Sequence, residues 1–150
     1  MGQKLTVLFL GDVIGQPGTR AVFTHLKQLT KKTAADIVIV NGENAAEGFG
    51  LTPEAVRTLF DAGATVITTG NHVWQRKELF PLLDSEPRLL RPGNYPPGSP
   101  GHGHCVVDVR GIPVAVANLQ GRKRMPSTDC PFRKATELLR SLERDVRVVL

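Results

Sequence analysis

Three short apolar runs, rich in β-branched residues, are separated by stretches with helical spacing, and each run is followed directly by glycine and polar residues. The runs cover residues 5–10 (LTVLFL), 37–40 (IVIV) and 66–69 (VITT). Runs of this length and composition that alternate with helices are typical of parallel strands in an α/β sheet. The sequence therefore predicts a mainly parallel sheet with helices in its connections.

The polar residues after these runs form a second pattern. Asp12 follows the first run, Glu43 and Asn44 follow the second, and Asn71 and His72 follow the third. In parallel α/β sheets, ligands bind beyond the carboxyl ends of the strands, so we expect these side chains to converge on one edge. Two carboxylates, two amide oxygens and an imidazole suit one or two hard or borderline cations. This set predicts a metal-dependent phosphoesterase site.

Each of these residues also has a purely structural interpretation. Asp12 is placed to cap a helix or a glycine turn, and Glu43 is placed to be solvated in the turn after the strand. Asn44 either donates an amide oxygen to a metal or braces its loop, and the sequence favours neither. His72 follows Asn71 directly, so we expect its imidazole to face the substrate and to donate a proton to the leaving oxygen. The alternative for this pair is a helix cap followed by a packed histidine.

Start and stop signals locate the helices. A helix is predicted over residues 17–32, where a proline stands at the first position. A second begins at Thr52, which offers a hydroxyl cap before a proline and a glutamate, and ends at Gly63. Further helices are predicted over about residues 76–83 and 132–144.

The second half of the chain predicts a different arrangement. Residues 91–103 (RPGNYPPGSPGHG) cannot form a regular helix or a central strand, and we expect a surface excursion. Residues 105–109 and 114–119 predict a hairpin, and residues 146–150 predict a last strand. The chain stops where the earlier strands deliver their polar residues. We therefore expect residues 1–150 to be a single, incomplete domain of a longer protein.

Composition restricts the class of protein further. No apolar run approaches the ~20 residues of a membrane span, so a cytoplasmic protein is expected. Cys105 and Cys130 are too few for a disulfide framework and are predicted to be unpaired. The formal charge of +5 has two interpretations: most such excesses are solvated surface, but a modest positive field also draws phosphate-bearing substrates inward. The basic cluster at residues 122–124 is too short to predict a stable nucleic-acid partner. Nothing in the composition decides whether the protein forms a homo-oligomer.

Three segments carry a family resemblance. Residues 11–18 (GDVIGQPG), 41–50 (NGENAAEGFG) and 68–74 (TTGNHVW) resemble the YmdB-like metallophosphoesterases, a bacterial branch of the calcineurin-like phosphoesterases. The resemblance runs collinearly over essentially the whole chain. It implies a metallophosphoesterase-like α/β sandwich that binds two divalent metal ions, Fe or Mn. It also implies hydrolysis of phosphodiesters such as 2′,3′-cyclic nucleotides.

The resemblance also implies a role for individual residues. By position, Asp12 would bind one metal ion, Glu43 would bridge both, Asn71 would bind the second, Asn44 would be a further ligand, and His72 would be the proton donor. Ile14 stands where the wider superfamily has the histidine of an Asp-x-His motif, which fits the YmdB-like branch. No substrate-binding residue is implied.

One departure from the family concerns its remaining ligands. The family supplies further histidine ligands after the strand that corresponds to residues 146–150, and this sequence ends before them. His102 and His104 have the spacing of a metal-binding pair but fall in a spacer where the family has no ligand. They are predicted to be surface loop residues, and His25 is predicted to be an exposed or partly packed helix residue. Without the missing histidines, metal ions would bind weakly.

Other functions fit the sequence less well. A serine hydrolase with a Gly-Asp-Ser motif does not fit, because Val13 occupies the nucleophile's place. The first glycine-rich turn lacks the spacing of a dinucleotide-binding loop. A non-catalytic nucleotide- or protein-binding module is the alternative that stays open.

Overall fold

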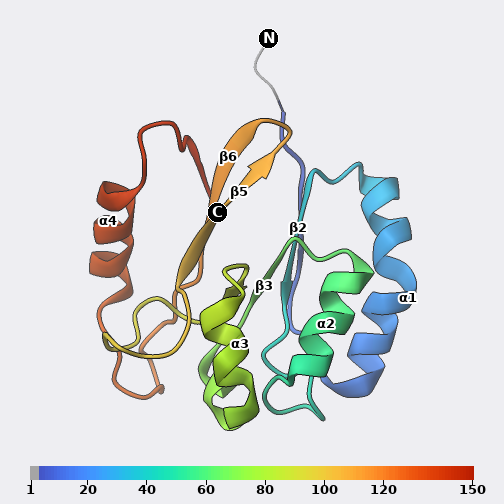
Figure 1. The fold of residues 1–150 in the computed structure, drawn as a ribbon, viewed down its shortest axis with the longest axis horizontal. Coiled ribbons are helices and arrows are strands. Elements are labelled where there is room, and N and C mark those ends of the chain that lie inside the picture. The colour runs from blue at the N-terminus through green and yellow to red at the C-terminus, as the bar shows by residue number, and fades with distance from the viewer. Residues whose placement is uncertain (1–3) are drawn as a thin grey trace.

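Two β-sheets pack against each other in the structure, a computed structural model that describes residues 4–150 (Figure 1). The first sheet is entirely parallel, and its strands lie in chain order: β1 (Val7–Leu10), β2 (Ile37–Asn41), β3 (Val66–Thr68) and β4 (Leu89–Leu90). The second sheet contains β5 (His104–Val109), β6 (Ile112–Ala117) and β7 (Val148–Val149). Strands β5 and β6 are antiparallel, and β7 lies parallel to β6.

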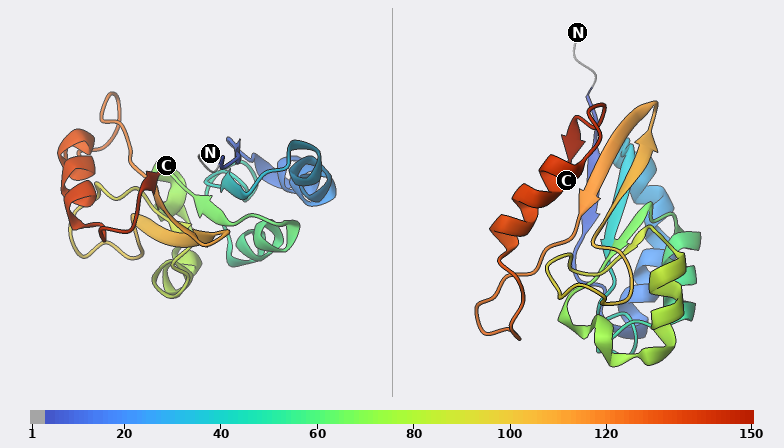
Figure 2. Two further views of the ribbon diagram at one scale, coloured as in Figure 1. Left: turned by 90° about the horizontal axis from the view of Figure 1, so that it is seen from above. Right: turned by 60° about the vertical axis from the view of Figure 1, so that its left-hand side comes forward.

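Helices cover the outer face of the first sheet, whereas alternate residues of β5 in the second sheet stay exposed. The helical elements are α1 (Gly15–Thr33), α2 (Pro53–Ala62), the 3-10 turns η1 (Asn71–Gln75) and η2 (Lys77–Leu79), α3 (Phe80–Ser85) and α4 (Pro131–Ser141). Crossovers between parallel strands are right-handed, so strands that follow one another in chain order place α1, α2 and α3 on one face of the first sheet. Figure 2 shows α4 on the far side, beyond the second sheet. The resulting α/β sandwich with mainly parallel strands is the predicted fold class.

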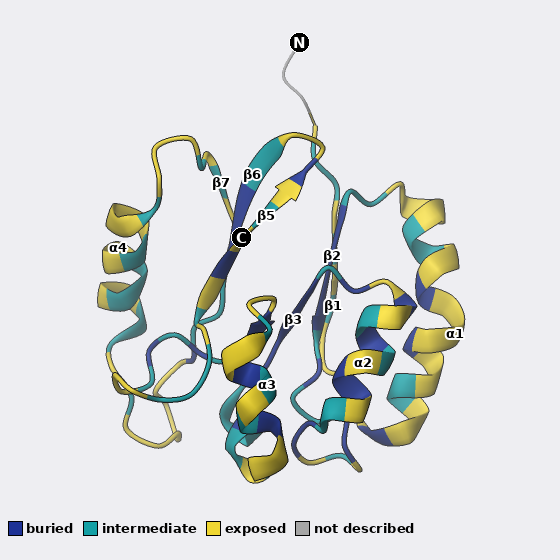
Figure 3. Cartoon of the chain, in the orientation of Figure 1, coloured by how far each residue is buried: buried dark blue, intermediate teal, exposed yellow. Residues whose placement is uncertain are grey.

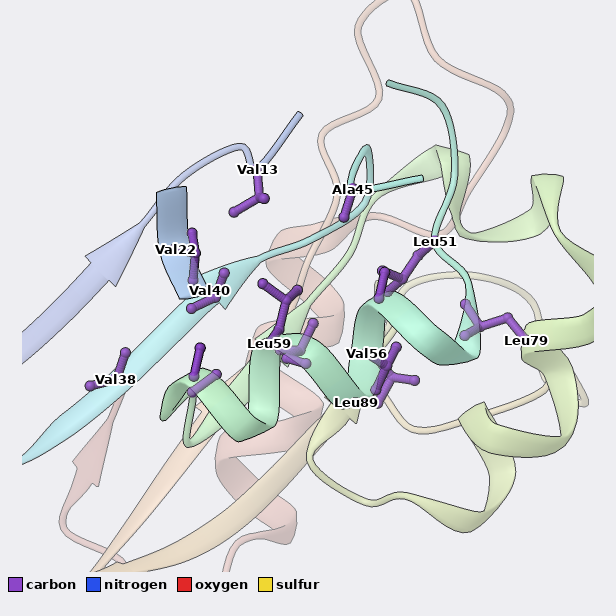
Figure 4. Packing of buried hydrophobic residues seen from close by; sticks show 14 of the residues in the cluster. Val13, Val22, Val38, Val40, Ala45, Leu51, Val56, Leu59, Leu79 and Leu89 are labelled. Atoms are coloured by element: carbon purple, nitrogen blue, oxygen red, sulfur yellow. The ribbon is translucent and has the colours of Figure 1, made fainter. Parts of the chain in front are cut away.

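Alternation along β2 divides the core into two layers. Val38 and Val40 point toward the helices, where they join a cluster that includes Leu59 (Figure 4). Ile37 and Ile39 point the other way and pack against residues of the second sheet. Successive side chains of a strand face opposite sides of the sheet, so one strand serves both layers. This central strand is buried along its apolar length (Figure 3).

The edge strand β1 is covered on one face only. Leu8 and Leu10 pack against the helical layer. Phe9 pairs in register with Ile39 and therefore lies on the inter-sheet face, yet its side chain is 59% exposed. The second sheet does not extend over this part of β1.

Local sequence signals located α2 correctly. The Thr52 side chain caps the helix by accepting a hydrogen bond from the backbone N–H of Ala55 at 3.2 Å. Gly63 ends the helix in the left-handed region, with φ of 113°. The hairpin is also confirmed, because β5 and β6 pair around Arg110 and Gly111, which both have positive φ.

The predicted helix at residues 76–83 was placed too early. The segment begins with the 3-10 turn η2, and the α-helix starts only at Phe80. Arg76 interrupts the path with an extended backbone, with φ of −119° and ψ of 98°. Pro81 then lies in the first turn of α3, where its missing N–H costs nothing.

Residues 91–103 are more than a surface excursion. Asn94 is fully buried, and its side-chain amide donates to the carbonyl oxygens of Gln120 at 2.8 Å and Asp129 at 2.9 Å. Its side-chain oxygen accepts from the backbone N–H of Gln120 at 2.9 Å. These bonds fasten the proline-rich segment to the chain that leads into α4.

The remaining sequence predictions have mixed outcomes. Cys105 and Cys130 are both unpaired, as predicted. His104 is the first residue of β5 and not a loop residue, although it is exposed. Within residues 4–150, no helix combines the length and the apolar character that crossing a membrane requires.

Candidate metal and catalytic site

The loops that leave β1, β2 and β3 are joined by backbone hydrogen bonds at one edge of the sheet. The N–H of Val13 donates to the carbonyl oxygen of Asn41 at 3.0 Å, and that of Gly15 donates to Asn44 at 2.8 Å. The N–H of Gly42 donates to Thr68 at 3.0 Å. Pairing therefore continues past the ends of the strands, and the polar residues of three separate motifs are held side by side.

Asp12 and Asn44 form the first side-chain contact of the site. The amide nitrogen of Asn44 donates to both carboxylate oxygens of Asp12, at 3.1 and 3.0 Å. An ionised carboxylate only accepts hydrogen bonds, so the amide nitrogen must be the end of Asn44 that faces Asp12. The side-chain oxygen of Asn44 is therefore turned the other way.

That oxygen meets His72. Nδ1 of His72 lies 2.5 Å from Oδ1 of Asn44. A carbonyl oxygen only accepts, so Nδ1 must carry the hydrogen, and Nε2 is the nitrogen left for other partners. Asp12 thus fixes the orientation of Asn44, which in turn fixes the tautomer of His72.

Glu43 lies across the backbone of the third motif. Its carboxylate accepts a long hydrogen bond of 3.4 Å from the N–H of His72. A Cβ atom on Gly70 would overlap with this carboxylate. Glycine at position 70 is therefore what allows Glu43 to lie so close to the loop that carries Asn71 and His72.

The structure connects four of the predicted site residues through side-chain contacts: Asp12, Glu43, Asn44 and His72. Asn71 lies in the same loop, at the start of η1 and half-buried, and its side chain makes no hydrogen bond within residues 4–150. His25 is exposed on α1, and Nε2 of His102 lies 3.2 Å from the carbonyl oxygen of Asp84, outside this network.

The donor atoms at this edge suit a hard cation only in part. Asp12, Glu43 and Asn71 offer two carboxylates and an amide oxygen, which are ligands for such cations. Both polar ends of Asn44 are engaged by other side chains, which is the bracing role that the sequence left open. Among residues 4–150, no three or more His, Cys, Asp and Glu side chains are grouped so that they could hold a metal ion. The ligand roles stay predictions.

One neighbour of the site was missed in the sequence. The Phe49 ring lies against the His72 imidazole, with centroids 4.2 Å apart and planes 45° apart. A single aromatic residue in a glycine-rich loop carries no signal of this contact, because it depends on how two loops approach each other.

The chain has the metallophosphoesterase fold, since it superimposes on a phosphatase from Mycoplasma pneumoniae with a TM-score of 0.88. That similarity has 33% sequence identity and covers 99% of this chain and 55% of the phosphatase. The family of YmdB-like proteins matches residues 8–150, and the chain belongs to this family.

Two further comparisons agree. The chain is 46% identical over 135 residues to a 2′,3′-cyclic-nucleotide 2′-phosphodiesterase of Bacillus subtilis (strain 168). The aligned part covers 90% of this chain and 51% of the relative. A crystal structure of a hypothetical protein from Thermus thermophilus has a TM-score of 0.86 at 44% identity, covering 91% of this chain and 53% of the other. The chain thus spans about half the length of these relatives.

Proposed function

We propose that this chain carries the proton donor and part of the metal site of a cytoplasmic phosphodiesterase that hydrolyses phosphodiesters such as 2′,3′-cyclic nucleotides. The observation that carries this proposal is the chain of contacts from Asp12 through Asn44 to His72. It holds an imidazole in one tautomer beside two carboxylates. The name of the Bacillus subtilis relative supports the substrate class.

Two divalent metal ions, Fe or Mn, complete the proposed site. Asp12, Glu43 and Asn71 would hold them, and Asn44 would join only by giving up its contact with His72. Bound cations of this kind neutralise charge that develops on a phosphoryl group and supply an activated water. Carboxylate and amide oxygens are ligands that such ions bind.

His72 would protonate the leaving ribose oxygen. In the imidazolium form both ring nitrogens carry hydrogen, and Asn44 holds the one on Nδ1. The proton on Nε2 is then the one transferred to the departing oxygen. After transfer the ring is neutral with hydrogen on Nδ1, which is the tautomer that Asn44 stabilises. Asn44 therefore keeps hydrogen on Nδ1 before and after the transfer, so that Nε2 is the nitrogen that gives up its proton, and it does so without touching the substrate.

The test uses the product of the whole gene that encodes this chain, because the relatives are about twice as long. The purified protein is assayed for hydrolysis of 2′,3′-cyclic AMP with Mn²⁺ or Fe²⁺. We expect turnover in the wild type, and we expect His72→Ala to abolish it while the bound Mn²⁺ is nearly unchanged. Glu43→Gln should lower both metal content and turnover.

Three results would count against the proposal. A folded, metal-loaded protein that hydrolyses no phosphodiester would remove the catalytic function. A folded protein that binds nucleotides but retains no metal would favour the non-catalytic binding module instead. Loss of metal together with turnover in His72→Ala would make His72 a ligand and not a proton donor.

A further inference from the structure

Phe49 presents an aromatic ring to solvent at the edge of the candidate site. Its side chain is 49% exposed, although one side of the ring lies against His72, 4.2 Å away between centroids. An aromatic ring that is left this open gains little of the free energy that burial of its apolar surface would provide. The ring is therefore positioned at the site but only partly covered by the protein.

The loop that carries Phe49 has a defined backbone. The N–H of Phe49 donates to the carbonyl oxygen of Ala46 at 2.8 Å, and the N–H of Ala46 donates to Gly50 at 3.0 Å. Glu47 has a φ of 52° and forms an ion pair with Arg76 at 3.0 Å. These contacts fix the tip of the loop, so the exposure of Phe49 follows from the turn itself.

A second apolar side chain lies next to this turn. Ile14 is 57% exposed, and its Cγ2 atom would be 3.7 Å from a Cβ atom placed on Gly48. Ile14 also forms a β-bridge with Asn44, which contacts both Asp12 and His72. Two exposed apolar side chains, Ile14 beside Asn44 and Phe49 beside His72, therefore border the polar network.

We propose that Phe49 forms a nucleobase subsite, in which the exposed face of its ring stacks on the base of the substrate while Ile14 contacts the edge of the base. This inference rests on the proposed function. In a 2′,3′-cyclic nucleotide the carbon that bears the base is bonded directly to the carbon of the 2′ oxygen. A leaving oxygen at Nε2 of His72 therefore confines the base to the neighbourhood of that imidazole, where Phe49 lies.

Stacking on Phe49 would give preference for a base without selecting one base. Every nucleobase has a flat π face, so an aromatic platform accepts all of them, whereas hydrogen bonds would discriminate. Apart from His72, which the proposed function commits to the leaving oxygen, the described contacts of Phe49 include no polar side chain that could recognise a base edge. We therefore expect purine and pyrimidine cyclic nucleotides to be accepted alike, and substrates without a base to bind more weakly.

Phe49 has one rival role, which is to hold His72 in place. A positioning residue would affect every substrate equally, with or without a base. The test therefore compares 2′,3′-cyclic AMP with the 2,3-cyclic phosphate of methyl riboside, which lacks a base. We expect Phe49→Ala to raise KM for cyclic AMP about tenfold, which lies within the range of base–aromatic stacking. The KM for the base-free substrate should stay the same.

Two variants serve as controls. Phe49→Trp keeps an aromatic face and should keep the low KM for cyclic AMP. Phe23→Ala removes another phenylalanine, which is 54% exposed on α1, and should change KM for neither substrate. Equal effects of Phe49→Ala on both substrates, or no effect on either, would overturn the inference.

A binding measurement separates this inference from the proposed function. Adenosine 3′-monophosphate and ribose 3-phosphate are titrated into the same protein by calorimetry, which needs no turnover. If Phe49→Ala weakens only the adenosine ligand, the subsite stands even when no hydrolysis is seen. If hydrolysis is normal but both ligands respond equally to Phe49→Ala, the subsite fails and the proposed function stands.

Discussion

The side-chain oxygen of Asn44 lies 2.5 Å from Nδ1 of His72, and the amide nitrogen of the same residue reaches the carboxylate of Asp12. An asparagine between an acid and a histidine is uncharged, yet it lets the acid determine how the histidine ring is held. The acid sets which end of the amide faces it, and the amide then sets which ring nitrogen of the histidine holds the hydrogen. This relationship makes the tautomer of His72 a property that can be measured.

The first prediction is that Asn44→Ala releases the His72 ring. We expect the Nδ1–H tautomer of wild-type His72 to give way to a mixture of tautomers, as seen by ¹⁵N NMR of the imidazole. Loss of such an orienting partner lowers activity by about 10- to 100-fold, and we expect a drop in kcat of this order. Exposed His25 provides the reference for an unconstrained ring in the same spectrum. An unchanged His72 tautomer in the variant would show that Asn44 does not set it.

The second prediction concerns Gly70. A Cβ atom at this position overlaps with the Glu43 carboxylate, which is the flexible end of its side chain. Gly70→Ala should therefore displace Glu43 at little cost in melting temperature, because the carboxylate can move. Mn²⁺ binding, followed by calorimetry, should weaken strongly. Gly121→Ala is the matched control, since a Cβ atom there meets nothing within 4 Å. Equal Mn²⁺ affinities in the two variants would argue against Glu43 as a ligand.

Features that depend only on residues adjacent in the sequence were predictable without the structure. Thr52 and Gly63 bound α2 because capping needs only the adjacent backbone. The strand β4 was missed, since Leu89 and Leu90 are too few to show a period. Its identity comes from parallel pairing with β3, where Ile67 pairs with Leu89 and the N–H of Ile67 donates to the carbonyl oxygen of Arg88 at 2.9 Å. Long-range pairing, and not local pattern, makes this segment a strand.

The candidate site divides in the same way. The meeting of the three motifs at one edge follows from the geometry of parallel strands, and it could be inferred without coordinates. The role of Asn44 could not, because an amide offers both a donor and an acceptor, and the partners of each end lie 32 and 28 residues away. Phe49 gave no signal, since its contact with His72 depends on the shape of two loops.

The third prediction concerns Asp36, which ties the two sheets together. Its carboxylate accepts from the N–H of Thr6 at 2.8 Å and from the guanidinium of Arg110, in the β5–β6 turn, at 2.9 Å. The bond from Thr6, and then that from Arg110, hold the pKa of Asp36 below its ordinary value. A lowered pKa in the folded state stabilises the protein at pH values above the unfolded pKa of about 3.9, and the effect is lost as the pH falls through the folded pKa.

We therefore expect Asp36→Asn to lower the melting temperature by a constant amount between about pH 6 and 8, with the difference shrinking below about pH 4. Melting curves of both proteins across this pH range provide the measurement. Asp61→Asn is the control, because Asp61 is exposed and forms no ion pair within residues 4–150. A difference that grew toward acid pH would contradict the assignment.

The fourth prediction separates the two cysteines by reactivity. Burial raises the pKa of the Cys105 thiol to about 11. At Cys130, which precedes α4, the backbone N–H of Arg133 lowers the thiol pKa, with a smaller contribution from that of Phe132. The thiolate is the reactive form, so at pH 8 we expect iodoacetamide to label Cys130 at least about 100-fold faster than Cys105. Mass spectrometry of digested samples over time measures both rates. In Cys130→Ser, Cys105 should stay almost unlabelled in the folded protein, and urea should make it react. Labelling of Cys105 in the folded protein at the rate seen in urea would contradict its burial in the apolar cluster between the two sheets.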